Sequence, residues 1–464
     1  MKKFDVIIIG AGPGGYVTAI RSAQLGFKTC IIENKHLGGI CLNWGCIPTK
    51  ALLRSAEVYG MMQHAESYGL SATQISFDIS KVVQRSRAIS KQLNQGVGHL
   101  LKKNKVSVLM GTAKLNGSES VQVETEAAVT ETLTAPNIII ATGARPRILP
   151  DLKLNNKFLW TYFEAMVPTK IPNSILVIGS GAIGIEFASF YNALGSNVTI
   201  VEILSQILPN EDTEISSIAR KQMEKHGIKF ITDTKVTQLY NENDGVKVEL
   251  KGMNGQGNTI FVEKVISAIG VQGNIENIGL ETTGIKTSNG CIHVNKYGLT
   301  DEPGIYAIGD VAGPPMLAHK AEHEGVVCVE NIAGLEVQPI DTKKIPSCTY
   351  SIPQIASIGM SEDTAKKNGF TPRIGKFPFV GNGKAIALGE PEGLVKTIFD
   401  SNSGELLGAH LVGADVTELI HGFTIAIGLE TTEKELMSTI FPHPTLSEMM
   451  HESVLNAYGR TIHF

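Results

Sequence analysis

The stretch Val6-Ile7-Ile8-Ile9-Gly10-Ala11-Gly12-Pro13-Gly14-Gly15 opens the chain and decides its fold. Its continuous run of β-branched residues is typical of a strand buried on both faces. Gly10, Gly12 and Gly15 then match the pattern G-x-G-x-x-G. The first glycine makes a tight turn, and the second lets a pyrophosphate approach the N-terminus of the next helix. The stretch therefore predicts a dinucleotide-binding unit of strand, turn and helix.

The residues after this turn continue the same unit. A helical pattern runs over 16–25 and ends at Gly26, and a second strand is expected over 29–32 with Glu33 at its end. An acid roughly 20 residues after such a turn commonly binds an adenosine ribose. We therefore predict a ribose contact for Glu33, against the alternative of a solvated acid at a strand end.

The pattern occurs a second time. Residues 175–178 are an apolar run that leads into another G-x-G-x-x-G, followed by a helix, a strand over 198–201 and the acid Glu202. One such turn is a weak signal, because it can simply pack a helix on a strand. Two copies, each with an acid at the same offset, predict two dinucleotide sites. The glycines of the second turn are Gly179, Gly181 and Gly184.

Glu202 also indicates the nicotinamide cofactor. A carboxylate at this position repels the 2′-phosphate of NADP, and an arginine is the residue that accommodates that phosphate. No arginine follows Glu202 before Arg220. We therefore expect NAD at the second site.

Length, charge and apolar pattern narrow the function classes. A chain of 464 residues is too long for one hydrophobic core, so two to four domains are expected. The net charge of -4 gives no electrostatic case for nucleic acid or anionic membranes. No stretch approaches the roughly 18 apolar residues of a membrane span, and Asp5 and Gly10 interrupt the opening run before it reaches the length of a secretory signal. We expect a cytoplasmic protein.

The rest of the chain divides by pattern. Helical periodicity runs through 51–104, most clearly over 79–103, and alternation over 106–133 predicts antiparallel strands. Pro146, Pro150 and the segment from Pro168 to Pro172 mark a linker between domains. Further buried strands that end in a glycine turn or an acid are expected at 138–143, 265–270 and 304–310.

From about residue 343 the composition changes. Strand-like alternation runs through 358 and recurs over 395–398 and 406–412, and helices are expected over 416–428 and 446–457. This part has no glycine fingerprint. We therefore predict a separate α+β domain.

Cys41 and Cys46 stand close together, directly after the first dinucleotide unit. A structural disulfide closing so short a loop adds little stability to a cytoplasmic protein. A zinc site needs a second Cys or His pair at metal spacing, and none stands near. A redox pair beside a cofactor accounts for the position. Residues five apart do not share a helix face, so the segment is expected to be distorted, with Gly45 and Pro48 as suitable residues.

The segment Gly38-Gly39-Ile40-Cys41-Leu42-Asn43-Trp44-Gly45-Cys46-Ile47-Pro48-Thr49-Lys50 resembles the redox-active disulfide motif of the flavin-linked disulfide reductases. The resemblance covers nearly the whole chain, through both glycine turns, Ala141-Thr142-Gly143, Gly309-Asp310 and His443-Pro444-Thr445-Leu446-Ser447-Glu448. It implies an α/β fold with two Rossmann-like dinucleotide-binding domains, for FAD and NAD, and a C-terminal α+β dimerisation domain. The implied domains are 1–148 for FAD, 149–271 for NAD, 272–342 as a central domain that completes the FAD site, and 343–464 for dimerisation.

The resemblance implies a role for each reacting residue. Cys41 is the outer thiol that exchanges with substrate, and Cys46 is the inner thiol next to the flavin. His443, contributed by the other subunit of a homodimer, is the base that a mostly protonated thiol needs. Glu448 holds the imidazole and stabilises its charged form. A second interpretation of Glu448 stays open, because Thr445 to Glu448 also matches a helix capping box.

The resemblance also implies the cofactor contacts. Lys50 and Glu186 form a pair beside the flavin and the nicotinamide, although Lys50 by itself is also an ordinary first-turn lysine. Asp310 binds the flavin ribitol, and a helix that begins at Met316 stabilises negative charge on the flavin. The other residues implied to bind cofactor, besides the glycines and acids of the two turns, are Thr142, Gly143, Gly270, Leu317, Ala318 and His319.

Within the family, the sequence is similar to the members that oxidise dihydrolipoyl groups of 2-oxo acid dehydrogenase or glycine cleavage complexes. Leu446-Ser447-Glu448 supports this, and the absence of any cysteine after Cys348 argues against a mercuric reductase. The implied partners are the lipoyl domains and the core acyltransferase of such a complex, and the implied substrate is a small dithiol. A reductase of a glutathione-like or peptidic disulfide and a redox sensor without turnover are the alternatives.

Three positions depart from the family pattern. Trp44 stands where the family usually has valine, and Phe441 stands where it usually has histidine. Residues 270–274 lack the frequent Arg-x-Pro-Asn pattern. None of these departures removes a reacting group, but the first two are expected to reshape access for the lipoyl group.

Overall fold

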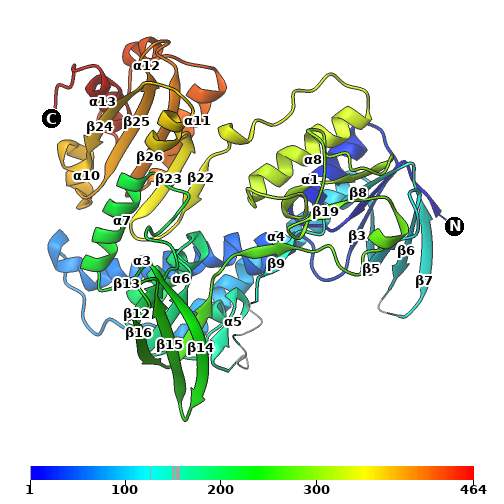
Figure 1. The fold of residues 1–464 in the computed structure, drawn as a ribbon, viewed down its shortest axis with the longest axis horizontal. Helices are drawn as coiled ribbons and strands as arrows, with labels where there is room; N and C mark the ends of the chain where they lie inside the picture. Colours follow the sequence, from blue (N-terminus) through cyan, green and yellow to red (C-terminus); the bar gives the residue numbers. More distant parts are fainter. Residues whose placement is uncertain (1, 126, 149–151, 153–156) are drawn as a thin grey trace. The chain divides into compact units, whose positions relative to one another are not determined.

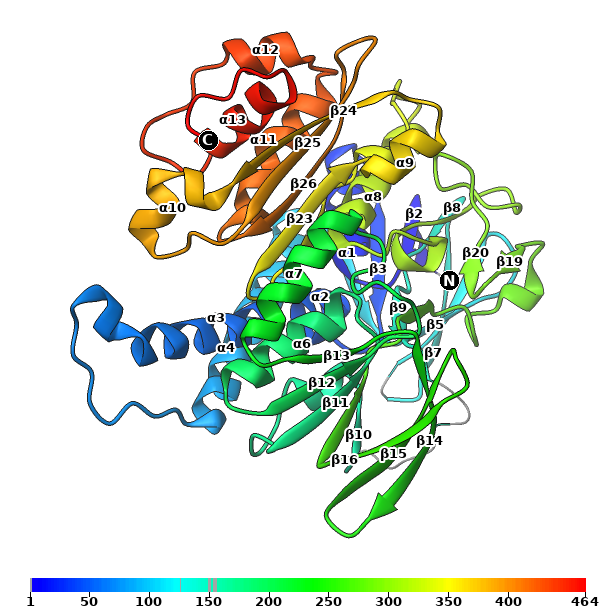
Figure 2. The same ribbon diagram turned by 60° about the vertical axis from the view of Figure 1, so that its left-hand side comes forward.

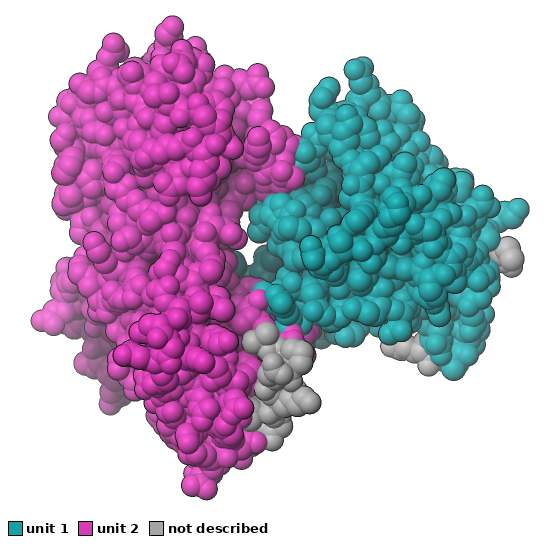
Figure 3. Space-filling model, viewed as in Figure 1, with its two compact units in different colours: residues 1–52, 78–147, 270–340 teal, residues 53–77, 148–269, 341–464 magenta. Residues whose placement is uncertain are grey.

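The computed structural model describes residues 2–125, 127–148, 152 and 157–464. The chain forms two compact units (Figure 3). The first unit comprises 1–52, 78–147 and 270–340, and the second comprises 53–77, 148–269 and 341–464. Pro150 and the start of the predicted second domain at residue 149 lie outside the described residues. The predicted four-domain division is therefore kept as a proposal.

A five-stranded parallel sheet forms the centre of the first unit (Figure 1), with the strand order β21-β8-β2-β3-β4. The residues of β2 are fully buried, as expected for a parallel strand covered on both faces. Helices α1 and α8 pack against each other. The bounds are β2 (Val6–Ile9), α1 (Pro13–Gln24), β3 (Thr29–Glu33), β4 (Ser107–Met110), β8 (Asn137–Ile140), β21 (Ile305–Ala307) and α8 (Ala318–Ile332).

Three further helices carry or adjoin the cysteine segment. Helix α2 (Gly39–Trp44) leads into α3 (Cys46–Gln63), and α4 (Ile79–Lys103) follows later in the chain with the bounds that the sequence predicted. Figure 2 shows α3 and α4 in blue. Between the end of α3 at Gln63 and the start of α4 at Ile79, the helical residues form one short 3-10 turn, η1 (Ala65–Tyr68). The helical patterns expected within 51–104 are confirmed in α3 and α4, whereas most residues between these two helices are not helical.

A smaller sheet of order β1-β7-β6-β5 completes the strands before β8. The pairs β5–β6 and β6–β7 are antiparallel, as predicted for 106–133, but β4 in the same range pairs parallel with β3. Alternation predicts a half-exposed strand and carries no information about its direction, which explains this difference. The other bounds in this unit are β1 (Lys2–Lys3), β5 (Thr112–Leu115), β6 (Ser120–Glu124), β7 (Thr130–Thr134), β9 (Ala144–Pro146), β18 (Val271–Gly273), η2 (Leu280–Thr282), β19 (Thr287–Ser288), β20 (Cys291–Ile292) and η3 (Gly309–Ala312).

The second unit repeats the first sheet. Its parallel order β10-β17-β11-β12-β13 places the strand before the second glycine turn between two parallel neighbours, as β2 lies between β8 and β3. An antiparallel sheet, β14-β15-β16, is inserted before β17 just as β5-β6-β7 precedes β8. The bounds are β10 (Leu159–Trp160), α5 (Tyr162–Ala165), β11 (Ser174–Ile178), α6 (Ala182–Ala193), β12 (Asn197–Val201), α7 (Thr213–Lys225), β13 (Lys229–Ile231), β14 (Thr234–Glu242), β15 (Gly245–Gly252), β16 (Gly257–Val262) and β17 (Lys264–Ser267). The predicted second dinucleotide-binding fold is confirmed.

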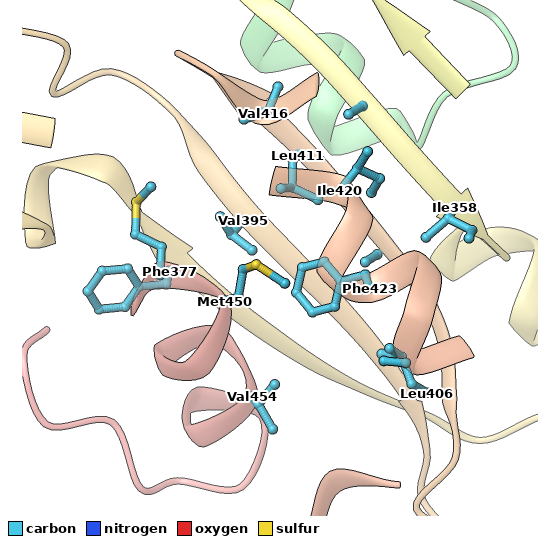
Figure 4. Packing of buried hydrophobic residues seen from close by; sticks show 14 of the residues in the cluster. Ile358, Phe377, Val395, Leu406, Leu411, Val416, Ile420, Phe423, Met450 and Val454 are labelled. Atoms are coloured by element: carbon cyan, nitrogen blue, oxygen red, sulfur yellow. The ribbon is translucent and has the colours of Figure 1, made fainter. Parts of the chain in front are cut away.

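The C-terminal part of this unit is an antiparallel sheet of order β22-β23-β26-β25-β24 covered by helices. Figure 4 shows Phe423 of α11 and Met450 of α13 packed over Val395 of β25. The bounds are η4 (Thr342–Lys344), β22 (Ser347–Thr349), β23 (Gln354–Gly359), α9 (Glu362–Lys367), β24 (Pro372–Pro378), η5 (Phe379–Gly381), α10 (Gly383–Leu388), β25 (Leu394–Asp400), β26 (Leu406–Gly413), α11 (Val416–Gly428), α12 (Glu433–Ser438) and α13 (Glu448–Ala457). The predicted α+β domain is confirmed. Among the described residues, no helix has the length and apolarity needed to cross a bilayer.

Candidate active site

A break between two helices brings the two cysteines together. Helix α2 ends at Trp44, Gly45 adopts φ -141° and ψ -114°, and α3 begins at Cys46. The Cys41 thiol has the Cys46 side chain as its hydrogen-bond partner across this break. A Cβ at Gly45 would lie 3.1 Å from the Ile40 carbonyl oxygen, so glycine suits the close approach. The predicted distortion is confirmed at Gly45.

Pro48 does not produce the break. It lies in the first turn of α3, where its missing N–H removes no helical hydrogen bond. Thr49 N–H donates to the Gly45 carbonyl at 3.2 Å, so the helical pattern resumes directly after the break.

The electrostatics around the pair favour the protonated Cys41 thiol. Its hydrogen bond with Cys46 and its burial raise the pKa of Cys41 above the ordinary value, and the positive charge of Lys50 opposes this rise. A thiol in this state is a poor nucleophile because the thiolate is the reactive form. Reaction of the reduced pair with a disulfide therefore needs a base from elsewhere.

His443 and Glu448 form the arrangement expected of such a base. The Nδ1 of His443 donates to Glu448 Oε1 at 2.8 Å, and the imidazole is otherwise exposed. The bond between His443 and Pro444 is cis. With Nδ1 held by the carboxylate, Nε2 is the nitrogen that can exchange a proton at the exposed end of the ring.

Glu448 contacts both groups that its sequence pattern suggested, the His443 ring and the Thr445 backbone, but the capping box itself is not formed. Its Oε2 accepts from the Thr445 N–H at 2.9 Å while its Oε1 accepts from His443. Burial acts to raise the pKa of Glu448, but the Thr445 N–H and His443 lower it below the usual range. The carboxylate is thus held ionised beside the imidazole. Helix α13 itself begins one residue after Ser447, so Thr445 is not its N-cap.

The two glycine turns have matching geometry. A Cβ at Gly15 would lie 1.9 Å from the Gly10 carbonyl oxygen, and one at Gly184 would lie 2.1 Å from that of Gly179. The third glycine of each turn therefore packs the helix on the strand. Glycines 10 and 179 also have positive φ, +105° and +98°.

Glycine is needed at the second position of each turn for a different reason. A Cβ at Gly12 would meet only the Gly39 Cα, at 4.0 Å, and one at Gly181 would meet nothing within 4 Å. Both residues are N-caps with ordinary φ, and neither helix has a side-chain cap at that end. Since protein packing and backbone strain do not require glycine here, the open cradle fits a pyrophosphate that approaches the helix N-terminus.

Glu33 and Glu202 are buried, which excludes the solvated alternative. Glu33 Oε2 accepts from the Ala11 N–H at 2.8 Å, and Glu202 Oε2 accepts from the Ser180 N–H at 2.8 Å. Each acid therefore braces its own glycine turn. An ionised carboxylate has about four lone-pair sites, so a ribose contact fits beside these bonds and stays a prediction.

The other predicted cofactor residues of the first unit lie in two groups. Thr142 and Asn274 exchange two hydrogen bonds of 2.8 Å, next to Gly143, whose φ is +68°. Gly270 accepts from the Arg147 N–H at 3.0 Å. Asn274 keeps its place although the Arg-x-Pro pattern before it is absent.

The second group surrounds Asp310, in η3 directly after β21. Burial raises the pKa of Asp310. Helix α8 begins at Ala318, so Met316 and Leu317 precede it and only Ala318 and His319 are helical. The prediction that the helix begins at Met316 was wrong by two residues.

Lys50 and Glu186 are placed by separate elements, α3 and α6. Glu186 is buried and its Oε1 accepts from the Tyr350 N–H at 3.0 Å. This bond was not visible in the sequence. The pairing of Lys50 with Glu186 stays a prediction.

Sequence reasoning missed several residues that hold the site. Lys320 is buried, pairs with Glu324 at 3.0 Å and donates to the Gly313 carbonyl at 2.8 Å, while Glu324 accepts from the Gly309 N–H at 2.8 Å. The spacing of Lys320 and Glu324 on one helix was the available signal, but a charge pair four residues apart usually lies on a solvated face.

The two aromatic departures also have partners. Arg87 stacks over the Trp44 ring at 4.5 Å, and the rings of Phe441 and His451 stack at 5.5 Å. Across the described ranges, no cluster of three or more His, Cys, Asp or Glu side chains could hold a metal ion.

Comparison with known proteins agrees with this geometry. The family model described as pyridine nucleotide-disulphide oxidoreductase matches residues 4–325, and that of the dimerisation domain of these proteins matches 345–454. Proteins named dihydrolipoyl dehydrogenase from Rhizobium etli and Zymomonas mobilis are 56% and 54% identical, and each alignment covers 99% of both chains. One of the same name from Bacillus subtilis is 44% identical and covers 100% of this chain and 99% of its own.

Solved structures show the same fold. LpdA from Mycobacterium tuberculosis superposes with a TM-score of 0.91 at 24% identity, covering 98% of this chain and 99% of its own. The HOCl-induced flavoprotein disulfide reductase RclA from Escherichia coli, as its Cu(II) complex, has a TM-score of 0.88 at 25% identity, with coverage of 98% and 99%. With the family match extending over 4–325 and relatives more than 40% identical along its whole length, the chain belongs to the enzymes of the pyridine nucleotide-disulphide oxidoreductase family.

Proposed function

We propose that the chain is an NAD-dependent dihydrolipoyl dehydrogenase that holds FAD and works as a homodimer. The observation that carries this proposal is the helix break at Gly45, which brings Cys41 and Cys46 together immediately after a dinucleotide-binding fold. The name shared by its most similar full-length relatives supports the same substrate class. The dimer is supported by the match of the C-terminal domain to a dimerisation domain.

The reaction begins with the Cys41–Cys46 disulfide. One thiolate of the dihydrolipoyl group attacks the Cys41 sulfur, a mixed disulfide forms, and Cys46 leaves as a thiolate. The second substrate thiolate then attacks the mixed disulfide, closes the lipoyl ring and releases Cys41 as a thiolate. Bound FAD would supply the electron acceptance that reoxidises the pair and the hydride chemistry needed to reduce NAD⁺.

In this proposal His443 serves as the base for the two substrate thiols in turn, and it releases the first proton to solvent before it takes the second. Its Nε2 takes the proton from a thiol, and Glu448 stabilises the imidazolium through Nδ1. The family resemblance assigns this His443 to the disulfide of the other subunit. An exposed imidazole already held by a carboxylate supports that assignment.

The cofactor roles are proposed by the same reasoning. Gly12 and Gly181 admit the two pyrophosphates, and Glu33 and Glu202 bind the riboses. Glu202 excludes a 2′-phosphate and so selects NAD over NADP. Lys50, Glu186, Asp310 and the segment from Met316 to His319 are proposed to surround the flavin and nicotinamide rings.

The wider assignments are proposals as well. The four domains are 1–148, 149–271, 272–342 and 343–464. We expect the lipoyl domains and core acyltransferase of a 2-oxo acid dehydrogenase complex as partners. We expect the cytoplasm as location, because a reversible thiol pair operates where thiols are kept reduced.

An anaerobic titration of the purified flavoprotein with dihydrolipoamide tests the proposal. We expect a long-wavelength absorption band from a Cys46 thiolate next to oxidised flavin, and turnover with NAD⁺ far above that with NADP⁺. Cys41→Ser should abolish lipoamide turnover while NADH still reduces the flavin. Full lipoamide activity in that variant, or greater activity with a glutathione-like disulfide, would overturn the proposal.

A further inference from the structure

Helix α4 fastens the cysteine segment through its side chains. Four of its residues donate hydrogen bonds to backbone carbonyls spread along residues 37–51, on both sides of the Gly45 break. The bonds are Asn94 Nδ2 to Leu37 O at 2.8 Å, Arg87 Nη1 to Asn43 O at 2.6 Å, Ser86 Oγ to Pro48 O at 3.1 Å and Arg85 Nη1 to Ala51 O at 2.9 Å. A helix distant in sequence therefore holds both arms of the break.

Arg87 contacts the residues closest to the break. Its guanidinium lies over the Trp44 ring at 4.5 Å while Nη1 donates to the Asn43 carbonyl, and Nη2 donates to Ser90 Oγ at 3.3 Å. Asn43 and Trp44 are the last two residues of α2. Burial lowers the pKa of Arg87, but guanidinium stays protonated in proteins, so the contact keeps its charge.

We propose that Arg87 is a positioning residue for the redox pair: by holding Asn43 and Trp44 it fixes the end of α2 and thereby sets how readily Cys41 and Cys46 join in a disulfide. This inference rests on the proposed function. Trp44, which departs from the family pattern, provides the flat surface that a guanidinium stacks on.

The effect follows from the chemistry of exchange. With oxidised glutathione, the two cysteine thiols give the disulfide and two molecules of reduced glutathione. The equilibrium constant depends on how much of the time the two sulfurs lie in bonding geometry. Loosening the end of α2 lowers that fraction and makes the disulfide easier to reduce.

Other contacts of α2 do not depend on Arg87. Asn43 Nδ2 donates to the carbonyls of Leu37 and Gly39 at 2.9 and 2.8 Å, and Asn94 also holds Leu37. Loss of Arg87 therefore loosens the end of α2 beside Gly45, while the hydrogen bonds of the Asn43 side chain and of Asn94 remain. We expect Arg87→Ala to fold and to retain flavin.

The test equilibrates the flavoprotein anaerobically in glutathione buffers, alkylates the free thiols and counts them by mass. Arg87→Ala should lower the equilibrium constant for disulfide formation by about tenfold, which is about 30 mV for a two-electron couple. Arg85→Ala is the matched control, since Arg85 donates to Ala51 well inside α3, and we expect no shift. Arg87→Lys, which keeps a donor but loses the planar stack, should shift part of the way.

Trp44→Leu removes the other partner of the stack. It should also lower the equilibrium constant for disulfide formation. The double variant should lower the equilibrium constant by less than the two single variants would together, because Arg87 and Trp44 act through one contact. Equal constants in all variants, or equal shifts for Arg87→Ala and Arg85→Ala, would overturn the inference. If Arg87→Ala fails to bind flavin, Arg87→Lys and Trp44→Leu decide, and wild-type constants in both would overturn it.

Failure of the proposed function has a different signature. It would appear in the wild type itself, as cysteines that form no disulfide or as absent lipoamide turnover. Failure of the Arg87 inference would leave the wild-type disulfide and its turnover intact.

Discussion

Glu448 does two tasks with two oxygens. One oxygen accepts from the Thr445 backbone and the other from His443, so the same side chain fixes the chain before α13 and orients the imidazole. The sequence pattern left a catalytic role and a helix capping box as alternatives. The box is not formed because Ser447 is the N-cap of α13, but the Thr445 and His443 contacts coexist because a carboxylate can accept several bonds at once.

This geometry predicts different outcomes for two substitutions at the base. His443→Gln should retain FAD and lose lipoamide turnover by about 10² to 10⁴-fold, the usual cost of removing acid–base help. Glu448→Gln should keep the Thr445 contact and the thermal midpoint, yet slow turnover because a neutral amide stabilises an imidazolium less. Steady-state rates and thermal unfolding check both. A normal rate in His443→Gln would dismiss it as the base.

Glu211 predicts a pH dependence of stability. Burial raises its pKa to about 7, with a smaller effect from Asp212, and the hydrogen bond with Ser357 only partly opposes this. Between the ordinary carboxyl pKa and 7 the folded protein binds more protons than the unfolded chain, so the free energy of unfolding falls as pH rises through this window. The loss has an upper bound of about 3 kcal/mol.

Glu211→Gln should therefore lose less stability than the wild type between pH 5 and 8. Thermal midpoints across this range measure the difference. The exposed acid Glu405 provides the control, since Glu405→Gln should follow the wild-type curve. A wild-type midpoint that rises from pH 5 to 8, relative to Glu211→Gln, would contradict the prediction.

At the level of elements, the glycine turns were readable because their chemistry is local. A Cβ at Gly184 collides with the Gly179 carbonyl within the same turn, so the sequence pattern carries the packing requirement directly. The contacts of α4 were not readable. Arg87 meets Trp44 across a long sequence separation, and no local pattern says which helix face an arginine will contact. The direction of β4 was hidden for the same reason.

The two glycines of the second turn should respond differently to alanine. Gly181→Ala meets no atom within 4 Å and keeps an ordinary φ, so the fold, flavin and thermal midpoint should stay unchanged while KM for NAD⁺ rises. Gly184→Ala places a Cβ 2.1 Å from a carbonyl oxygen and should destabilise the protein by several kcal/mol. KM and thermal unfolding separate them. An unchanged KM for NAD⁺ in Gly181→Ala would show that the pyrophosphate does not bind at that turn.

On the scale of the whole molecule, long-range charge contacts join segments that were predicted from the sequence to be separate domains. Lys396 of β25 is buried and contacts Asp212, Glu214 and Glu362 at 2.9, 3.1 and 2.9 Å. Burial acts to lower the pKa of Lys396, but these carboxylates raise it above the ordinary value. Asp212 precedes α7 of the dinucleotide-binding part, so within the second unit this cluster joins that part to the C-terminal sheet.

Removing Lys396 from the centre of the cluster should therefore lower the free energy of unfolding more than removing Lys376 from its edge. Lys396→Met leaves Asp212 buried without its partner, and breaking a buried pair in this way typically costs about 3–5 kcal/mol. Lys376 also contacts Glu214, at 2.7 Å, but is 43% exposed, and Lys376→Met should cost about 1 kcal/mol or less. Urea unfolding measures the stability loss of each variant, and hydrogen exchange in α7 and β25 shows where the loss occurs. Equal small losses would show that solvent, rather than Lys396, neutralises the carboxylates, and the dinucleotide-binding part would then be joined to the C-terminal sheet mainly by apolar packing.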